Sequence, residues 1–298
     1  MRILIAGDSL ALPRPHRINN YSFLERDLAV AYEQTYPALL TKELLTDFQF
    51  NPYIEVINKS KRGQTIVGVH TEFVDNLFFH QPEIIIMHVG IVDCWFRDEL
   101  GGKQHVPIEQ FTAYLDKILS YLKLREECRL ILVGIAPTSV KMDGRYPGLN
   151  KAIMNYNKVL YSKVDYKNVF YIPVEKFVKI SDVHHYLLPD DQHLNVVGNH
   201  LVAKEVLRII KGIIFTKQGY LLQSDNDFNK MKRMFYRAYQ EYPQNIDTLY
   251  NLIVTSYETG DTSLLNEIIK FIIDNKIIDY ELEMLINQLS QLNILIKD

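Results

Sequence analysis

Short, continuously apolar runs that alternate with amphipathic helical patterns constrain the fold of this chain most strongly. These runs lack the alternation of a half-exposed strand and are typical of strands that are buried on both faces. We predict five such strands, at residues 2–6, 53–57, 83–90, 129–135 and 169–172. Strands that alternate with helices form a parallel sheet covered on both faces, and five such units fit the flavodoxin-like strand order. The predicted fold is therefore a flavodoxin-like, three-layer α/β/α domain with a five-stranded parallel sheet.

Helices are predicted between these strands and after the last one. The evidence is apolar spacing of three and four residues together with capping residues, such as Thr65 at the start of one helix. One helix is expected to begin near Thr35, and others cover residues 65–79, 107–124, 149–164 and 196–211. The glycine fingerprint of dinucleotide-binding folds is absent after the first strand, so no cofactor is expected.

The predicted secondary structure changes near Ser224. Beyond this residue the sequence predicts helices and no strands. Residues 225–298 hold 12 acidic and 7 basic side chains, whereas residues 1–224 hold 24 and 26. The apolar pattern beyond this point predicts helices at 228–241, from 247 onward, at 264–275 and at 280–292. We predict an α/β domain at residues 1–215 and a small all-α domain at residues 225–298.

The spacing of apolar residues in the C-terminal region resembles a degenerate tetratricopeptide repeat. The matching positions are Leu249, Leu252, Gly260, Leu265 and Ile269, and half a unit precedes them between Met231 and Pro243. Fewer than about three repeats is short for an independent solenoid. The region is therefore expected to pack on the α/β domain or to bind a protein partner or a second copy, and a helical extension without a partner is the alternative.

Charge, cysteine content and hydropathy exclude several classes of protein. The net charge of −3 is too small to indicate nucleic acid as a partner. The two cysteines, Cys94 and Cys128, form no disulfide pattern. No apolar run is long enough to span a membrane, and no secretory signal precedes the first strand. We expect a cytoplasmic protein without a membrane span.

The strongest candidate for a nucleophile follows the first strand. Gly7-Asp8-Ser9-Leu10 places a serine at the carboxyl edge of the sheet, where ligands bind in open α/β folds. A nucleophilic serine needs a base and a group that orients the base. Asp190 and His193 precede the last helix of the domain, and their spacing of three residues lets them share one side of a helical turn. The sequence therefore contains the three residue types of a catalytic triad.

These motifs resemble the blocks of the GDSL, or SGNH, hydrolase family over residues 1 to about 212. Gly7-Asp8-Ser9-Leu10 matches the first block, and Asp190-Asp191-Gln192-His193 matches the last. Gly63 matches the glycine whose N–H helps to form the oxyanion hole. The resemblance implies that Ser9 is the nucleophile, His193 the base and Asp190 its orienting carboxylate. It also implies that the backbone N–H groups of Ser9 and Gly63 are oxyanion donors.

One position departs from the family pattern. Gly90-Ile91-Val92-Asp93 matches a G-x-N-D block at three of four places, and Val92 stands where the family has an asparagine that donates to the oxyanion. Arg62, Gln64 or a polar group of the substrate are alternatives for this missing donor. The predicted surroundings of the site are Asp8, Arg62, Gly90, Val92 and Asp93.

Some other residues are of types that could bind a metal ion or take part in other reactions. Potential metal ligands cluster in one stretch, at His184, His185, Asp190, Asp191 and His193. They lack a regular ligand spacing, so no metal is predicted. Cys94 is interpreted as a core thiol and His88 as an interior histidine.

Basic residues gather in two loops that should flank Ser9. They are Arg14, His16, Arg17, Lys59, Lys61 and Arg62. Either they attract an anionic substrate, with Arg14 and Arg17 as the predicted contacts, or they are ordinary solvated loop residues.

The family resemblance implies ester chemistry, often on acyl groups attached to carbohydrates. We therefore expect a serine esterase that acts through an acyl-enzyme on an O-acyl group of a saccharide or other small anionic metabolite. An O-acyltransferase with the same triad is one alternative, because acceptor choice depends on how the site excludes water. A non-catalytic scaffold protein is the alternative that Val92 favours.

Overall fold

The computed structural model describes residues 1–14, 29–46, 53–225 and 227–291. The chain divides into two compact units, Met1–Val206 and Leu207–Asp298. The division falls inside the long helix α9 (Val196–Leu221), which continues from one unit into the other. The predicted domain limits of 1–215 and 225–298 stay a prediction.

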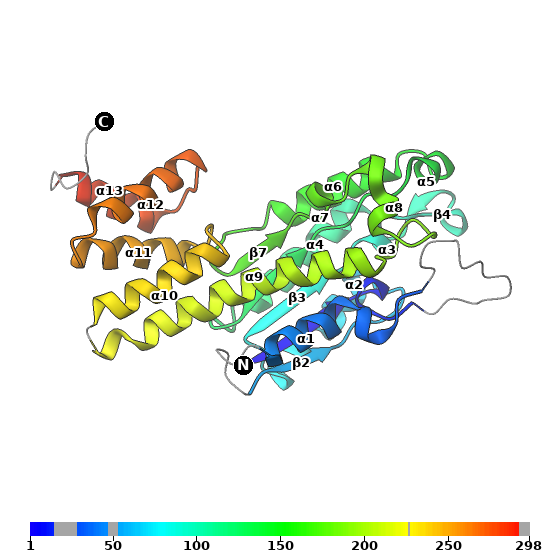
Figure 1. The fold of residues 1–298 in the computed structure, drawn as a ribbon. Coiled ribbons are helices and arrows are strands. Elements are labelled where there is room, and N and C mark those ends of the chain that lie inside the picture. Colours follow the sequence, from blue (N-terminus) through cyan, green and yellow to red (C-terminus); the bar gives the residue numbers. More distant parts are fainter. Residues whose placement is uncertain (15–28, 47–52, 226, 292–298) are drawn as a thin grey trace. The chain divides into compact units, whose positions relative to one another are not determined.

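The first unit is built on a five-stranded parallel sheet in the order β2-β1-β3-β6-β7, which confirms the predicted flavodoxin-like class (Figure 1). The strands are β1 (Arg2–Gly7), β2 (Glu55–Asn58), β3 (Ile84–His88), β6 (Arg129–Val133) and β7 (Val169–Ile172). All of them except the edge strand β2 are buried almost throughout, which explains their continuously apolar sequences. Because the strands are parallel, their carboxyl ends meet at one edge of the sheet.

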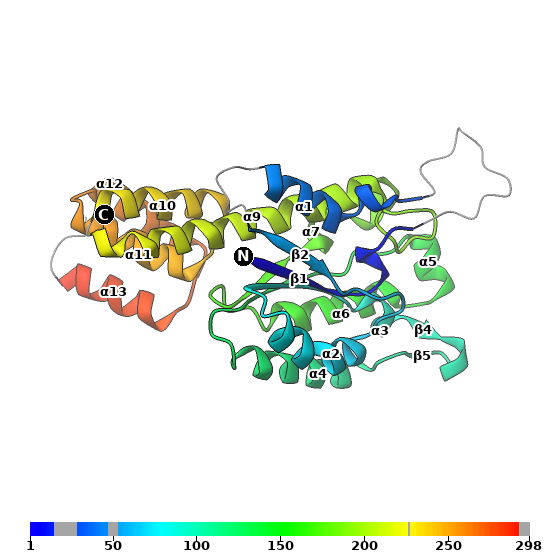
Figure 2. The ribbon, with the colours of Figure 1, turned by 90° about the horizontal axis from the view of Figure 1, so that it is seen from below.

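Helices cover both faces of this sheet (Figure 2). One face carries α2 (Ile66–Phe79), α4 (Ile108–Leu122) and α6 (Leu149–Tyr161), and the other carries α1 (Tyr36–Thr46) and the first part of α9. The described connections contain the short helices α3 (Ile91–Cys94), α5 (Val140–Arg145), α7 (Val174–Phe177) and α8 (Val183–Tyr186). Apolar side chains of α2, α4 and α6 pack with the strands into one core, in which Phe73, Leu115 and Tyr156 are fully buried.

A small hairpin lies between β3 and α4, in a stretch for which the sequence predicted neither a strand nor a helix. β4 (Phe96–Arg97) and β5 (Lys103–Gln104) pair as antiparallel strands. Gly101 and Gly102 both have positive φ in the turn between them. Strands of two residues are too short to show a period of two, so sequence periodicity could not reveal this hairpin.

The end of β1 is determined by a close approach to β3. A Cβ atom at residue 7 would lie 2.2 Å from the carbonyl oxygen of His88. The N–H of Asp8 donates to the same oxygen at 3.1 Å. Gly7 is therefore required by the contact between the two strands, and not by a positive φ. Ser9 follows directly at the carboxyl edge of the sheet.

The described part of the second unit is helical, which confirms the predicted C-terminal helical region. It contains the end of α9 together with α10 (Phe228–Glu241), α11 (Ile246–Glu258), α12 (Thr262–Asp274) and α13 (Tyr280–Gln291). The helix expected at 196–211 is longer than predicted, because its continuation packs within this unit: Thr216 and Thr248 share a hydrogen bond of 2.6 Å. The tetratricopeptide likeness stays a prediction. The described residues contain no helix with the length and apolar character that crossing a bilayer requires, and a cytoplasmic location stays a prediction.

Candidate active site

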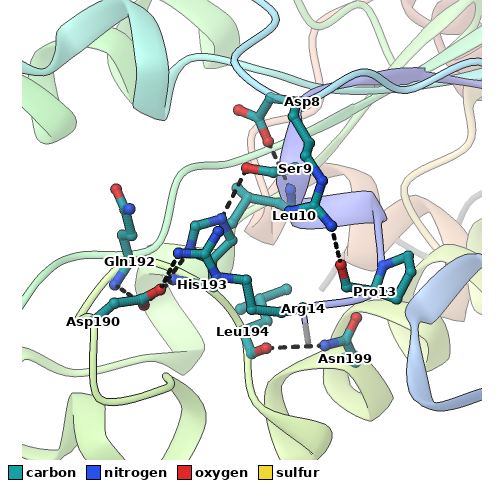
Figure 3. A network of polar contacts seen from close by, with 11 residues as sticks. Asp8, Ser9, Leu10, Pro13, Arg14, Asp190, Gln192, His193, Leu194 and Asn199 are labelled. Atoms are coloured by element: carbon teal, nitrogen blue, oxygen red, sulfur yellow. Dashed lines mark hydrogen bonds and ion pairs between the residues drawn. The ribbon is translucent and has the colours of Figure 1, made fainter. Parts of the chain in front are cut away.

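Ser9, His193 and Asp190 form a continuous hydrogen-bonded chain (Figure 3). Ser9 Oγ lies 2.8 Å from His193 Nε2, and His193 Nδ1 lies 2.7 Å from Asp190 Oδ2. The imidazole is buried and the serine is half-buried. A nucleophilic serine requires this arrangement, with a base in hydrogen-bond reach and a carboxylate that holds the base.

Ser9 begins a single 3-10 turn, Ser9–Ala11, immediately after β1. Asp8 caps this turn, since its Oδ1 accepts a hydrogen bond from the N–H of Leu10 at 2.9 Å. Burial raises the pKa of the Asp8 carboxyl to about 8, although that hydrogen bond acts in the opposite direction. The predicted near-site residue Asp8 is thus a buried, protonated cap that fixes the backbone of the serine.

Asp190 and His193 lie in the loop between α8 and α9, which is closed by its own backbone. The N–H of Leu188 donates to the carbonyl of His193 at 2.7 Å, and the N–H of Asn195 donates to that of Tyr186 at 2.8 Å. The N–H of His193 donates to Asp190 Oδ1 at 3.0 Å. The carboxylate that contacts the imidazole is therefore held by the same loop.

The side chains of Asn199 and Asp191 also connect this loop to other parts of the α/β unit. Asn199 on α9 donates to the carbonyl of Leu194 at 3.2 Å (Figure 3) and accepts from the N–H of Tyr36 at 2.8 Å. Asp191 has a left-handed φ of 59°, and its Oδ2 accepts from Ser139 Oγ at 3.0 Å. Since Ser139 also caps α5, the loop is anchored to both α1 and α5.

Asp190 is ionised over the ordinary pH range. Burial alone would raise its pKa, but hydrogen bonds from the ring and the backbone of His193 outweigh burial and lower the pKa to about 2. Arg14 Nη2 lies 3.2 Å from Asp190 Oδ2 and adds a positive charge beside the carboxylate. The role of Arg14 as a substrate contact stays a prediction, and the other predicted contact, Arg17, lies outside the described residues.

A cavity of about 430 Å³ opens beside Ser9, within the size range of small-molecule sites. Its wall includes the hydrogen-bonded chain itself, the predicted oxyanion donor Gly63 and Val92. Apolar and aromatic side chains complete part of the wall, namely Leu10, Ile91, Met142, Trp95 and Tyr146. Four arginines line the cavity, at Arg14, Arg62, Arg97 and Arg145.

Two backbone N–H groups are available at the cavity. Those of Ser9 and Gly63 donate to no other residue in the described part of the chain. Gly63 has a φ of 70°, and a Cβ atom there would meet nothing within 4 Å. The left-handed backbone, and not a lack of space, therefore favours glycine at this position.

Val92 faces the cavity with a side chain that donates no hydrogen bond. Of the predicted substitutes, Arg62 lines the cavity, whereas the side chain of Gln64 lies against Gly68 and is not part of the wall. Gln192 brings a carboxamide to the wall. Its position between Asp190 and His193 was a signal in the sequence that could have identified it.

Gly90 and Asp93 flank Ile91 and Val92, which line the cavity, but are not themselves among its described lining residues. A Cβ atom at Gly90, where φ is 131°, would lie 2.6 Å from Cδ1 of Ile135. Asp93 Oδ1 accepts from the N–H of Ile66 at 2.9 Å and so holds the start of α2. Burial raises the pKa of the Asp93 carboxyl to about 7.

His88 and Cys94 are buried side chains of the α/β unit. Burial lowers the pKa of His88 to about 3 and raises that of the Cys94 thiol, which agrees with their interpretation as interior side chains. Of the potential metal ligands at 184–193, His184 Nδ1 lies 3.2 Å from Asp191 Oδ1. Within the described ranges, no group of three or more His, Cys, Asp or Glu side chains could hold a metal ion.

Sequence reasoning missed several cavity residues outside the family blocks. Arg97 comes from the β4–β5 hairpin, Arg145 from the end of α5, and Trp95 and Tyr146 are their neighbours. No local pattern marks them, because they meet only through the tertiary fold. Of the predicted basic loop residues, Lys61 pairs with Glu72 instead.

The fold and the site together define a flavodoxin-like α/β protein with a serine–histidine–aspartate chain at the carboxyl edge of its sheet. The model of the GDSL-like lipase/acylhydrolase family matches residues 3–206, and the chain belongs to this family. It is an ester hydrolase of SGNH/GDSL type. Small-molecule esters are accordingly its class of substrate.

Solved structures share this fold at low sequence identity. LAE5, an alpha/beta hydrolase enzyme from the metagenome of Lake Arreo, Spain, is 20% identical with a TM-score of 0.52, and the match covers 68% of this chain and 91% of LAE5. Axe2, an acetylxylan esterase from Geobacillus stearothermophilus, is 19% identical with a TM-score of 0.54, and the match covers 70% of this chain and 92% of Axe2. A comparison with curated proteins found no match.

Proposed function

We propose that this chain is a serine esterase that removes an O-acyl group from a saccharide or other small anionic metabolite through an acyl-enzyme. One observation carries the proposal: Ser9 Oγ is 2.8 Å from His193 Nε2, whose ring is 2.7 Å from Asp190, at the wall of a cavity of small-molecule size. The four arginines of that cavity support an anionic substrate.

In the first half-reaction, Ser9 Oγ attacks the ester carbonyl carbon while His193 Nε2 takes the hydroxyl proton. Asp190 stays ionised and stabilises the imidazolium that forms. The tetrahedral intermediate then collapses, the bond between carbonyl carbon and alcohol oxygen breaks, and the departing alcohol takes the proton from His193. In the second half-reaction, water repeats these steps on the acyl-Ser9 and leaves as part of the carboxylic acid.

Negative charge on the carbonyl oxygen is stabilised by preorganised donors in this mechanism. The backbone N–H groups of Ser9 and Gly63 have no other acceptor in the described chain and are the donors we propose. Val92 adds none, whereas Gln192 and Arg62 line the same cavity and have side chains that can donate.

The comparison with Axe2 supports both the site and the kind of substrate. Three of the matched structures are catalytic mutants of Axe2, in which a serine, an aspartate or a histidine is replaced by alanine. The same three residue types form the hydrogen-bonded chain here. Axe2 is an acetylxylan esterase, so it acts on acyl groups carried by a saccharide.

Two alternatives differ in their chemistry. An O-acyltransferase would form the same acyl-enzyme but pass the acyl group to a hydroxyl in place of water. A scaffold protein would form no acyl-enzyme, and Val92 is the residue that favours it. The first experiment therefore asks whether Ser9 reacts at all.

The test is to treat the full chain with a fluorophosphonate and to assay hydrolysis of a short-chain aryl ester. We expect labelling of Ser9, turnover that persists in excess chelator, and loss of both signals in Ser9→Ala. Ser162→Ala, which changes an exposed serine at the end of α6, is the matched control and should behave as the wild type. Undiminished turnover by folded Ser9→Ala would remove the serine mechanism, and an unlabelled wild type would favour the scaffold.

A further inference from the structure

The cavity beside Ser9 contains an excess of positive charge. Among the described residues, its wall holds four arginines and one carboxylate, that of Asp190. Arg14 and His193 both contact that carboxylate. The other three arginines form no ion pair with any residue in the described part of the chain, so their charge is uncompensated there.

Arg97 is the most constrained of these three. Its backbone pairs with Lys103 in the hairpin ladder, and its carbonyl accepts from the N–H of Gly102 at 2.9 Å. The Nε atom is buried and has no hydrogen-bond acceptor among the described residues. A buried, unpaired N–H of a charged group is unfavourable unless a ligand accepts a hydrogen bond from it. The unpaired Nε of Arg97 therefore indicates that the cavity binds an anion.

Arg145 and Arg62 are oriented by contacts that leave their charge intact. The guanidinium of Arg145 lies 5.5 Å from the ring centroid of Tyr146, which itself packs edge-on against Trp95 at 5.4 Å. Arg62 Nη2 donates to the carbonyl of Pro13 at 2.8 Å. Neither contact supplies a negative charge, and both restrict where the guanidinium lies.

We propose that Arg62, Arg97 and Arg145 form a phosphate-binding subsite next to Ser9, so that the substrate is a small molecule carrying both an O-acyl group and a phosphate. This inference rests on the proposed function. A phosphate monoester carries a charge of about −1.5 to −2 and three acceptor oxygens, and it therefore matches three guanidinium groups better than a singly charged, two-oxygen carboxylate. Because the arginines and Ser9 line one cavity of about 430 Å³, both groups belong to the same small molecule.

The kinetic test compares three acetyl esters of one sugar: the uncharged glycoside, the uronic acid and the sugar phosphate. We expect kcat/KM for the phosphorylated ester to exceed the other two values by about 10- to 100-fold, the range that charge-assisted hydrogen bonds provide. Arg97→Gln and Arg145→Gln should each reduce this preference about tenfold, mainly through KM, and Arg97→Lys should restore part of it. Arg233→Gln, which removes an exposed charge on α10, is the matched control and should leave the preference unchanged.

A binding measurement separates this inference from the proposed function. Calorimetry with inorganic phosphate should show binding to the full-length wild type and to Arg233→Gln, and weaker binding to Arg97→Gln. Equal use of the carboxylate and phosphate esters, or an unchanged preference in both arginine variants, would overturn the subsite. If no ester is cleaved and Ser9 is not labelled, the proposed function fails. The calorimetric binding of phosphate to the wild type and to Arg97→Gln then tests the phosphate-binding subsite independently.

Discussion

At the residue scale, Val92 is the side chain by which this cavity differs most from the family pattern. One well-aimed oxyanion donor contributes about 3–4 kcal/mol, or roughly 10²–10³ in rate. We expect Val92→Asn to raise kcat on a simple aryl ester, but by less than this factor because the pocket was not shaped for an amide. Val92→Leu, which adds no donor, should show no gain and serves as the control.

The result for Val92→Asn also bears on what replaces the family asparagine. A well-folded variant that is no faster than the wild type would mean that the donor is already supplied, and Gln192→Ala should then slow the enzyme. Burying an amide without a partner would slow the enzyme for another reason. Urea midpoints of the variants therefore accompany the rates.

Asp8 makes the free energy of unfolding depend on pH, and the raised pKa of its carboxyl determines the direction. Its pKa is about 8 in the folded protein against an ordinary value of 3.8, so between these values the folded state holds a proton that the unfolded state has released. The contribution of Asp8 to stability therefore falls as pH rises through this window, by up to about 1.4 kcal/mol per pH unit. Asp93 follows the same direction, whereas the lowered pKa of His88 acts oppositely at acid pH.

A comparison with Asp8→Asn isolates this one carboxyl. The amide oxygen can still accept from Leu10, but the side chain no longer ionises. In urea unfolding at pH 5 and pH 8, we expect the stability advantage of the variant over the wild type to be larger at pH 8 than at pH 5. Parallel loss of stability by both proteins would show that the pKa of Asp8 is not raised in the folded protein.

At the scale of elements, Asn199 links α9, α1 and the loop that carries His193. Its side chain donates to the carbonyls of Leu194 and Asn195 and accepts from the N–H of Tyr36, in buried surroundings. Asn199→Ala removes the side-chain partner of the Leu194 carbonyl and of the Tyr36 N–H, and should lower the free energy of unfolding by about 2–4 kcal/mol.

The same substitution should lower kcat, because the loop loses a contact that fixes the position of His193. The control is His200→Ala, which changes the next and exposed residue of α9 and should alter neither quantity. An Asn199→Ala protein as stable as the control would mean that the backbone contacts of the loop suffice.

The elements also show what the sequence could and could not predict. Buried runs such as Ile84–His88 and the motif around Ser9 are local signals, so the parallel sheet and the residues of the hydrogen-bonded chain were predicted. The β4–β5 hairpin has strands of two residues and leaves no periodic signal. Arg97 and Arg145 were missed because they belong to different connections and meet only at the cavity.

At the scale of the whole molecule, the C-terminal unit adds helices that the proposed chemistry does not use. Several large apolar side chains are exposed where α12 leads into α13: Ile273 is 64% exposed, Ile278 81% and Tyr280 74%. Single exposed apolar residues are ordinary, but three within eight residues are a candidate site for contact with another protein. Self-association through the C-terminal region is one of the alternatives predicted from the sequence, and it would cover these side chains.

The last prediction tests that expectation in the full chain. Ile278→Glu places a charge in the middle of the exposed apolar group, where burial against a second copy would strongly disfavour it. We expect the wild type to form a concentration-dependent oligomer in sedimentation or light scattering, and Ile278→Glu to shift the mass toward the monomer while Ser9 labelling is retained. Phe79→Glu is the matched control, since Phe79 is also 81% exposed but lies at the end of α2 in the α/β unit. A wild type that stays monomeric at all concentrations, or an oligomer that responds equally to both substitutions, would show that this surface does not join copies of the chain.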